Sequence, residues 1–192
     1  MSANTEKRAL VILHEGVEEL EAVAPIDILR RGGVSVVTAA TAHDKTVTGR
    51  SGIALQADVQ LDAISADLFD CIVLPGGPGI QQSVRANRRI HDVLLAHFAA
   101  EKWIAAICAA PLILNDLGFL NHIRYTAHPS TQTELPAAIA EPCVRVDRIF
   151  ITATGAGMAI PFSLKILKIL TSEAVAKKVA ESISLPIDSK NV

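Results

Sequence analysis

The stretch WIAAICAAP, residues 103–111, decides how this chain folds. Its first five residues are apolar, as in a strand buried on both faces, and Pro111 suits the first turn of a helix, where its missing N–H costs nothing. Cys108 stands where the strand gives way to the helix, between the small residues Ala106 and Ala110. A nucleophile elbow requires such small neighbours, because its sharp strand-to-helix turn leaves no room for larger side chains.

The position of Cys108 favours a reactive thiol over a packing residue. An arbitrary cysteine is more often a small buried hydrophobe, but a thiol at a helix N-terminus lies at the positive end of the helix dipole, which favours the thiolate. Cys71 opens an apolar run and Cys143 lies in a loop beside a proline. We therefore interpret Cys71 and Cys143 as structural and Cys108 as the nucleophile.

Apolar runs and helical patterns alternate on both sides of this stretch. We expect strands at residues 9–13, 34–38, 71–74, 103–107, 144–147 and 150–153, and helices at 17–31, 87–100, 109–117 and 160–183, the last broken near 171–172. A Gly-, Thr- and Ser-rich segment, 46–55, indicates a hairpin outside the alternation, and Pro25 predicts a kink or break in the first helix. The alternation predicts an α/β fold with a mostly parallel sheet covered by helices.

Composition narrows the class of protein. Half of the 192 residues are hydrophobic, and 18 basic against 20 acidic residues give a net charge of −2, so nothing favours binding to nucleic acid. The N-terminal segment is too polar for a signal peptide, and the apolar runs are too short to span a bilayer. Three cysteines without a CxxC pair fit a reducing compartment, and no His/Cys spacing supports a metal site. We expect a single soluble, cytoplasmic domain.

Ligands of a parallel sheet bind at the carboxyl ends of the strands, which directs attention to the turn at residues 75–79. Its sequence, PGGPG, lacks the pattern of a phosphate-binding loop. The backbone amides of Gly76 and Gly77, together with that of Ala109, are candidates for holding an oxyanion if Cys108 attacks a carbonyl. A simple tight turn explains the glycines equally well.

Two titratable residues are candidate partners of the thiol. Glu21 lies in an otherwise apolar helical row with Val17, Ala24 and Ile28, so we expect a desolvated carboxyl that keeps its proton, although a place at the edge of the row also fits. His128 follows a short β-type run and is a candidate base, although a lone loop histidine is often only solvated. His14, at the end of the first strand, is a weaker candidate.

The chain resembles the ThiJ/PfpI superfamily, and within it the branch of the parkinsonism-associated deglycase (DJ-one). The matching segments are residues 8–13, 18–21, 27–33, 73–77 and 105–111. The resemblance implies a flavodoxin-like doubly wound sandwich, with residues 1–192 as one domain of the class I glutamine amidotransferase type. It also implies that Cys108 is the nucleophile, that Glu21 is the protonated partner of its sulfur and that His128 is the nearby imidazole. Asp27 matches a residue that is contributed across the family's dimer interface.

By this resemblance, the function is a cysteine-dependent, cofactor-independent glyoxalase or deglycase. Its substrates would be 2-oxoaldehydes such as methylglyoxal and glyoxal, or their early protein and nucleotide adducts, and the protein would be a homodimer. The alternative is a redox-sensing stress protein or chaperone that signals by oxidation of Cys108. Amidase or protease chemistry is disfavoured, because Ala109 stands where the protease-like branch has histidine. Thr154, Ala156 and Pro161 depart from residues common in the family and leave the substrate preference open.

Overall fold

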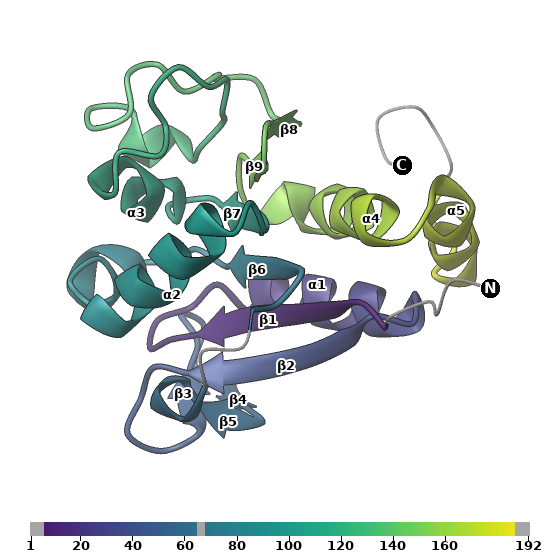
Figure 1. Ribbon diagram of the computed structural model, residues 1–192, viewed down its shortest axis with the longest axis horizontal. Helices are drawn as coiled ribbons and strands as arrows, with labels where there is room; N and C mark the ends of the chain where they lie inside the picture. The colour runs from purple at the N-terminus through teal and green to yellow at the C-terminus, as the bar shows by residue number, and fades with distance from the viewer. Residues whose placement is uncertain (1–5, 65–67, 187–192) are drawn as a thin grey trace.

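The computed structural model describes residues 6–64 and 68–186, which build a seven-stranded sheet with helices on both faces (Figure 1). The strand order is β5-β2-β1-β6-β7-β9-β8, and every neighbouring pair is parallel except β8 and β9. The strands of this sheet are β1 (Arg8–Leu13), β2 (Ser35–Ala40), β5 (Val59–Gln60), β6 (Cys71–Leu74), β7 (Trp103–Ile107), β8 (Val144–Asp147) and β9 (Phe150–Ala153). The predicted flavodoxin-like α/β sandwich is confirmed.

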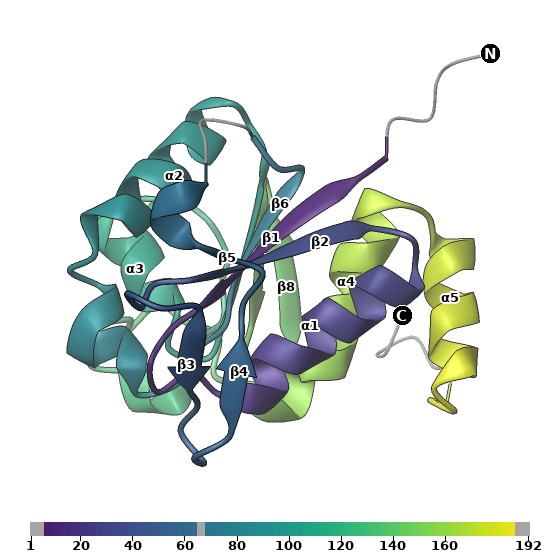
Figure 2. The same cartoon turned by 90° about the horizontal axis from the view of Figure 1, so that it is seen from below.

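Helices cover the sheet in two layers. They are α1 (Glu19–Arg31), α2 (Arg88–Ala99), α3 (Pro111–Asp116), α4 (Ala159–Leu170) and α5 (Glu173–Ser182). Figure 2 shows α1, α4 and α5 on one side of the sheet and α2 and α3 on the other. None of the helices within the described ranges combines the length and the apolar character needed to cross a membrane.

The continuous apolar runs of the strands follow from this layering. In β1, Val11 and Leu13 enter the core that contains α1 and α4, whereas Leu10 and Ile12 enter the core on the opposite face. Because successive side chains of a strand point to opposite faces, a strand covered on both sides has no position left for a solvated residue. The same reasoning explains β6, whose four residues are all buried.

The predicted helices are present with ends that differ by at most two residues, and the prediction made for Pro25 is the exception. The predicted break near residues 171–172 is confirmed, since α4 ends at Leu170 and the hydroxyl of Ser172 caps α5 by accepting from the N–H of Val175 at 3.3 Å. The break predicted at Pro25 is wrong, because α1 continues through it. Pro25 is buried in the interface that α1 makes with the rest of the fold, so packing outweighs the missing backbone hydrogen bond.

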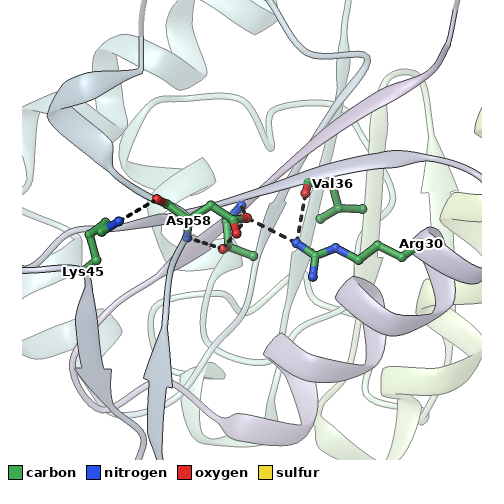
Figure 3. A network of polar contacts seen from close by, with 5 residues as sticks. Arg30, Val36, Lys45 and Asp58 are labelled. Carbon is green, nitrogen blue, oxygen red and sulfur yellow. Dashed lines mark hydrogen bonds and ion pairs between the residues drawn. The ribbon is translucent and has the colours of Figure 1, made fainter.

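A hairpin outside the main sheet, predicted from residues 46–55, is also confirmed. It consists of β3 (Thr46–Thr48) and β4 (Ala54–Gln56), and its base is fixed by Asp58 (Figure 3). Oδ2 of Asp58 accepts hydrogen bonds from the N–H and hydroxyl of Thr38 at 2.9 and 2.8 Å and from Arg30 at 3.2 Å. Although burial alone raises it, these bonds and the charge of Arg30 bring the pKa of Asp58 below its usual value. The hairpin is thereby tied to both β2 and α1.

His97 is a buried histidine whose two ring nitrogens are both used in the folded protein. Nδ1 donates to the carbonyl of Val93 at 2.8 Å, and Nε2 accepts from the N–H of Phe69 at 2.9 Å. One neutral tautomer satisfies both bonds, whereas the imidazolium ion has no lone pair to offer Phe69. Burial accordingly lowers the pKa of His97 below 6.5.

We expect the free energy of unfolding to decrease as the pH falls below 6.5, because the unfolded chain then binds a proton that folded His97 resists. The contribution is complete above 6.5 and is lost progressively toward the lower pKa of the folded state. Urea denaturation between about pH 7.5 and about pH 5.5 measures it. The His97→Gln variant should show a weaker pH dependence of the free energy of unfolding, and an unchanged dependence would contradict the assignment.

Candidate active site

Cys108 occupies a strained turn directly after β7. Its φ angle is +65°, in the left-handed region that L-residues rarely adopt. The N–H of Cys108 donates to the carbonyl of Ala153 at 2.9 Å, and its own carbonyl accepts from the N–H of His128 at 2.8 Å. Ala106 and Ala110 are fully buried on either side. The predicted elbow therefore exists, and its strained backbone is held by hydrogen bonds from two other segments of the chain.

Glu21 lies beside this turn, completely shielded from solvent on α1. Its Oε2 accepts a hydrogen bond from the N–H of Gly76 at 2.8 Å, and Oε1 has no hydrogen-bond partner among the described residues. Burial raises the pKa of Glu21 to about 7, against the opposing effects of the Gly76 N–H and of contact with Cys108. This is the direction expected for a desolvated carboxyl, so near neutral pH both protonation states are accessible.

The thiol does not have the lowered pKa that the sequence suggested. Burial raises the pKa of Cys108 to about 12, and the adjacent Glu21 carboxylate adds to this effect, while the N–H groups of Gly77 and Ala109 oppose it. The predicted helix dipole is weak at this position, because α3 begins only at Pro111, two residues after the predicted start. A thiolate is therefore compatible with a neutral Glu21 and disfavoured beside a charged one.

The glycine turn that follows β6 makes this close approach possible. A Cβ on Gly76 would lie 2.6 Å from Cβ of Cys108 and 2.8 Å from Oε2 of Glu21, so no other residue fits between them. Gly77 has a φ of +109°, and a Cβ there would lie 2.6 Å from the backbone nitrogen of Glu18. The N–H of Gly76 donates to Glu21 in this structure, so it would have to leave that carboxyl to hold an oxyanion, and its predicted role stays a prediction.

A pocket of about 330 Å³ opens above the thiol. It is lined by Arg50, Gly77, Pro78, Gln81, Cys108, Ala109, His128 and Ser130. His128 is exposed at its edge, and Nδ1 of its ring lies 2.8 Å from the hydroxyl of Ser130 and accepts from the Ser130 N–H at 3.1 Å. The structure thus brings His128 into the same pocket as Cys108, with the ring hydrogen-bonded to Ser130.

Arg50 is a pocket residue that the sequence did not reveal. Its guanidinium pairs with Glu18 at 3.1 Å, and its backbone N–H donates to the carbonyl of Val17 at 2.9 Å. The next residue, Ser51, donates its N–H to the buried carboxylate of Glu19 at 2.8 Å. The only signal in the sequence was that Arg50 is a charged residue at the tip of the glycine-rich hairpin. Docking of that tip on the start of α1 carries Arg50 to the pocket.

Asp27 is not brought to the thiol within one chain. It is half-exposed on α1, forms an ion pair with Arg31 at 2.7 Å, and lines a different hollow of about 580 Å³ between α1 and α4. The predicted contribution of Asp27 across a dimer interface stays a prediction. Ala156 and Pro161, two of the departures from the family pattern, line the same hollow.

Thr154, the third departure, has a structural role here. Its buried hydroxyl lies 2.9 Å from that of Thr126 and accepts from the N–H of Cys143 at 3.0 Å. These bonds connect the segment after β9 to two loops. One contains Cys143 and precedes β8, and the other contains Thr126 and leads to His128. Within residues 6–64 and 68–186, no group of three His, Cys, Asp or Glu side chains is arranged to hold a metal ion.

Comparison with known proteins gives a consistent relationship over nearly the whole chain. Residues 7–169 match the DJ-1/PfpI family. The chain is 33% identical to Protein dj-1beta of Drosophila melanogaster, covering 92% of this chain and 96% of that protein. It is 31% identical to the Glutathione-independent glyoxalase DJR-1.2 of Caenorhabditis elegans, covering 86% and 89% respectively.

Solved structures agree with the sequence comparison. The crystal structure of Drosophila melanogaster DJ-1beta superimposes with a TM-score of 0.91 at 32% identity, covering 95% of this chain and all of that one. The structure of oxidized Toxoplasma gondii DJ-1 gives a TM-score of 0.88, also at 32% identity, and covers 94% of this chain and all of that one.

Replacing Glu21 with glutamine tests the coupling between carboxyl and thiol. Because the Glu21 carboxylate helps to raise the pKa of Cys108, its removal should lower that pKa by about one unit or more, and thiol reactivity should extend to lower pH. The rate of Cys108 alkylation by iodoacetamide, followed by peptide mass spectrometry across a pH series, measures this change. Glu18→Gln is the control, because Glu18 pairs with Arg50 rather than with the thiol. Equal profiles for the wild type and Glu21→Gln would refute the coupling.

Proposed function

The chain belongs to the DJ-1/PfpI family, and from that premise we propose that it is a cysteine-dependent, cofactor-independent glyoxalase. Its substrates would be 2-oxoaldehydes such as methylglyoxal and glyoxal, which it would convert to 2-hydroxy acids. The observation that carries the proposal is the buried Glu21 carboxyl beside Cys108, a residue that lines a small pocket. A relative that bears the name glutathione-independent glyoxalase supports the substrate class.

In the first step, the sulfur of Cys108 adds to the aldehyde carbon, and the thiol proton passes to the carbonyl oxygen to give a hemithioacetal. The N–H groups of Gly77 and Ala109 face the sulfur and stabilise negative charge on it. The Glu21 carboxylate relays the thiol proton. It takes the proton from the thiol, is neutral while the sulfur attacks, and passes the proton to the carbonyl oxygen, so that it is a carboxylate again for the second step. The pocket admits a small carbonyl compound with its reactive carbon next to Cys108.

In the second step, Glu21 acts as base and then as acid. Its carboxylate takes the proton from the former aldehyde carbon and returns it to the neighbouring carbon, while the hydroxyl proton of the first carbon passes to the oxygen of the second. The first carbon is thereby oxidised and the second is reduced. Water then hydrolyses the resulting thioester, which releases the 2-hydroxy acid and regenerates the thiol. A carboxyl whose pKa is about 7 suits both directions of proton transfer near neutral pH. His128, at the edge of the pocket, is placed to exchange protons with the attacking water.

The same chemistry extends to early adducts of 2-oxoaldehydes with protein or nucleotide groups, which is the deglycase form of the proposal. Such adducts carry the same two-carbon unit, so the sulfur of Cys108 would bond to the carbon attached to the protein or nucleotide nitrogen. The carbon–nitrogen bond would break, and the amine would leave with the thiol proton. The exposed position of His128 leaves the mouth of the pocket open to a larger leaving group. A free, reactive thiol also fits the reducing cytoplasm that we propose as the location.

A redox-sensing stress protein or chaperone is the second candidate, and the difference between the cysteines favours it. Cys71 is fully buried, and its burial raises its pKa far above the usual range, which makes it inert. Cys108 is partly exposed and faces the N–H groups of Gly77 and Ala109. Those N–H groups, with a protonated Glu21, would bind the oxygens of a sulfinate formed by two equivalents of peroxide.

Incubation with methylglyoxal tests the enzymatic proposal. The wild type should form lactate without added cofactor, and Cys108→Ser should lower the rate by at least about a thousandfold, because the hydroxyl replaces the attacking thiol. Cys143→Ser is the matched control and should retain activity, since this thiol lies outside the pocket. Lactate can be quantified by chromatography of the filtered reaction.

Equal lactate formation by the wild type and Cys108→Ser, or none by either, would disprove the enzymatic proposal. If neither protein forms lactate, intact-mass analysis after mild peroxide treatment tests the second candidate function, a redox sensor that signals through Cys108. Two added oxygens confined to Cys108 would support it, and oxidation spread over all three cysteines would not.

We also propose that the protein is a homodimer that pairs through α1 and α4. Leu20 and Val23 on α1 and Ile160 on α4 are large apolar residues exposed around the hollow that Asp27 lines. Contiguous exposed apolar surface of this kind is typical of a protein–protein contact. A second copy of the chain would bury these side chains and bring Asp27 toward the partner's pocket.

Leu20→Arg should convert the dimer to a monomer, because it places a charge in the proposed apolar contact. Light scattering of the eluting protein should then give the mass of one chain instead of two. Leu95→Arg on α2 is the control, since Leu95 is also exposed but lies on the opposite face of the sheet. A wild-type monomer, or a dimer that Leu20→Arg leaves intact, would contradict this interface.

A further inference from the structure

His14 is a buried histidine that the proposed chemistry does not use. It follows β1 directly and is only 1% exposed. Its Nδ1 lies 3.0 Å from the carbonyl oxygen of Glu15, and its Nε2 lies 3.4 Å from the carbonyl oxygen of Pro75. Both oxygens only accept hydrogen bonds, whereas a neutral imidazole carries a single N–H. A neutral His14 can therefore satisfy one carbonyl, and an imidazolium ion satisfies both.

The Pro75 carbonyl leads directly to the reactive pair. It belongs to the same peptide group as the N–H of Gly76, and that N–H donates to Oε2 of Glu21 at 2.8 Å. His14 and Glu21 thus contact the two ends of one peptide group. Electron density is delocalised over such a group, so a donor at its oxygen makes its N–H a stronger donor.

Packing holds the His14 ring against the glycine turn. A Cβ added to Gly79 would lie 2.6 Å from Nδ1 of His14, which shows that the ring fits against the backbone of the turn. The turn cannot move away easily, because the carbonyl of Gly76 also accepts from the N–H of Glu18 at 3.0 Å. The His14 ring therefore lies against an acceptor with a fixed position, the carbonyl oxygen of Pro75.

We propose that His14 is a positioning residue that adjusts the Glu21–Cys108 pair through the Pro75–Gly76 peptide. The inference rests on the proposed role of that pair as the reactive centre. In the neutral form the proton resides on Nδ1, which has the shorter contact, and Nε2 donates no hydrogen bond to the Pro75 carbonyl. Proton uptake adds an N–H at Nε2, which strengthens the hydrogen bond from Gly76 to Glu21 and stabilises the Glu21 carboxylate.

The surroundings of His14 decide when this happens. Burial lowers the pKa of His14 below 6.5, while the carbonyls of Glu15, Pro75 and Gly76 and the charge of the Glu15 carboxylate act in the opposite direction. The Glu15 carboxylate, which accepts from the N–H of Thr48 on the hairpin, is the charged group that acts on His14 in the described part of the chain. The glycine turn contributes backbone groups only. Protonation of His14, and with it the stronger hydrogen bond from Gly76 to Glu21, is therefore expected under mildly acidic conditions.

Nuclear magnetic resonance of the wild type tests the connection without any assay of turnover. A pH series should show that the Gly76 amide proton shifts once with the Glu21 carboxyl and again, at lower pH, with the His14 ring. Two replacements of His14 then distinguish the effect of a donor at the Nδ1 position from that of a donor at the Nε2 position. The amide of His14→Asn places a donor near the Nδ1 position only, and that of His14→Gln reaches the Nε2 position permanently.

We expect His14→Gln to lower the midpoint of the Glu21 carboxyl titration by about 0.5 pH unit relative to His14→Asn. His14→Asn should keep the wild-type midpoint and lose the second shift of the Gly76 amide. His97→Gln is the control, because it removes a buried histidine that has no contact with the turn. Equal midpoints in the two His14 variants, or a wild-type Gly76 amide that ignores His14, would overturn the proposal. Absence of lactate formation alone would count only against the glyoxalase assignment.

Discussion

The burial of the Glu21 carboxyl is the constraint on which the rest of the site depends. One oxygen is held by the N–H of Gly76, and the other has no hydrogen-bond partner in the described chain. A carboxyl in that position is costly when charged, so it keeps its proton to a higher pH and can donate a hydrogen bond to a neighbour. The neighbour is Cys108, whose own burial also disfavours charge. The two groups therefore control each other's protonation, which neither would do on the protein surface.

Close packing around this pair explains the residues that surround it. Gly76 has to be glycine because a Cβ there would collide with both Cys108 and Glu21, and Gly77 because its backbone is left-handed and crowded. The hairpin tip adds Arg50 at the rim, fixed by Glu18 and by backbone bonds to the start of α1. Apart from Glu21, the groups that contact the thiol are backbone N–H groups, while Arg50 and Glu18 remain at the edge.

Much of the fold could be predicted from the sequence, because strands buried on both faces leave an unmistakable apolar run. Residues 71–74, 103–107 and 150–153 are such strands at the predicted bounds, and the edge strand at 144–147, which is only partly buried, also has its predicted bounds. Cys108 and Glu21 could be found because an elbow demands small neighbours and because an acid in an apolar row is conspicuous. Arg50 and the bond from Gly76 to Glu21 could not, because they depend on how distant segments meet. The break predicted at Pro25 was wrong for the same reason, since tertiary packing keeps α1 continuous through this residue.

The left-handed backbone of Cys108 has a consequence for biosynthesis. The bonds that hold it come from Ala153 and His128, which follow Cys108 in the chain and leave the ribosome after it. Until both segments have emerged and docked, the thiol belongs to an ordinary flexible loop, with the reactivity of any cysteine. The paired thiol thus arises only when the last third of the polypeptide is in place. An incomplete chain would not yet contain it, which keeps the chemistry of the site out of unfinished molecules.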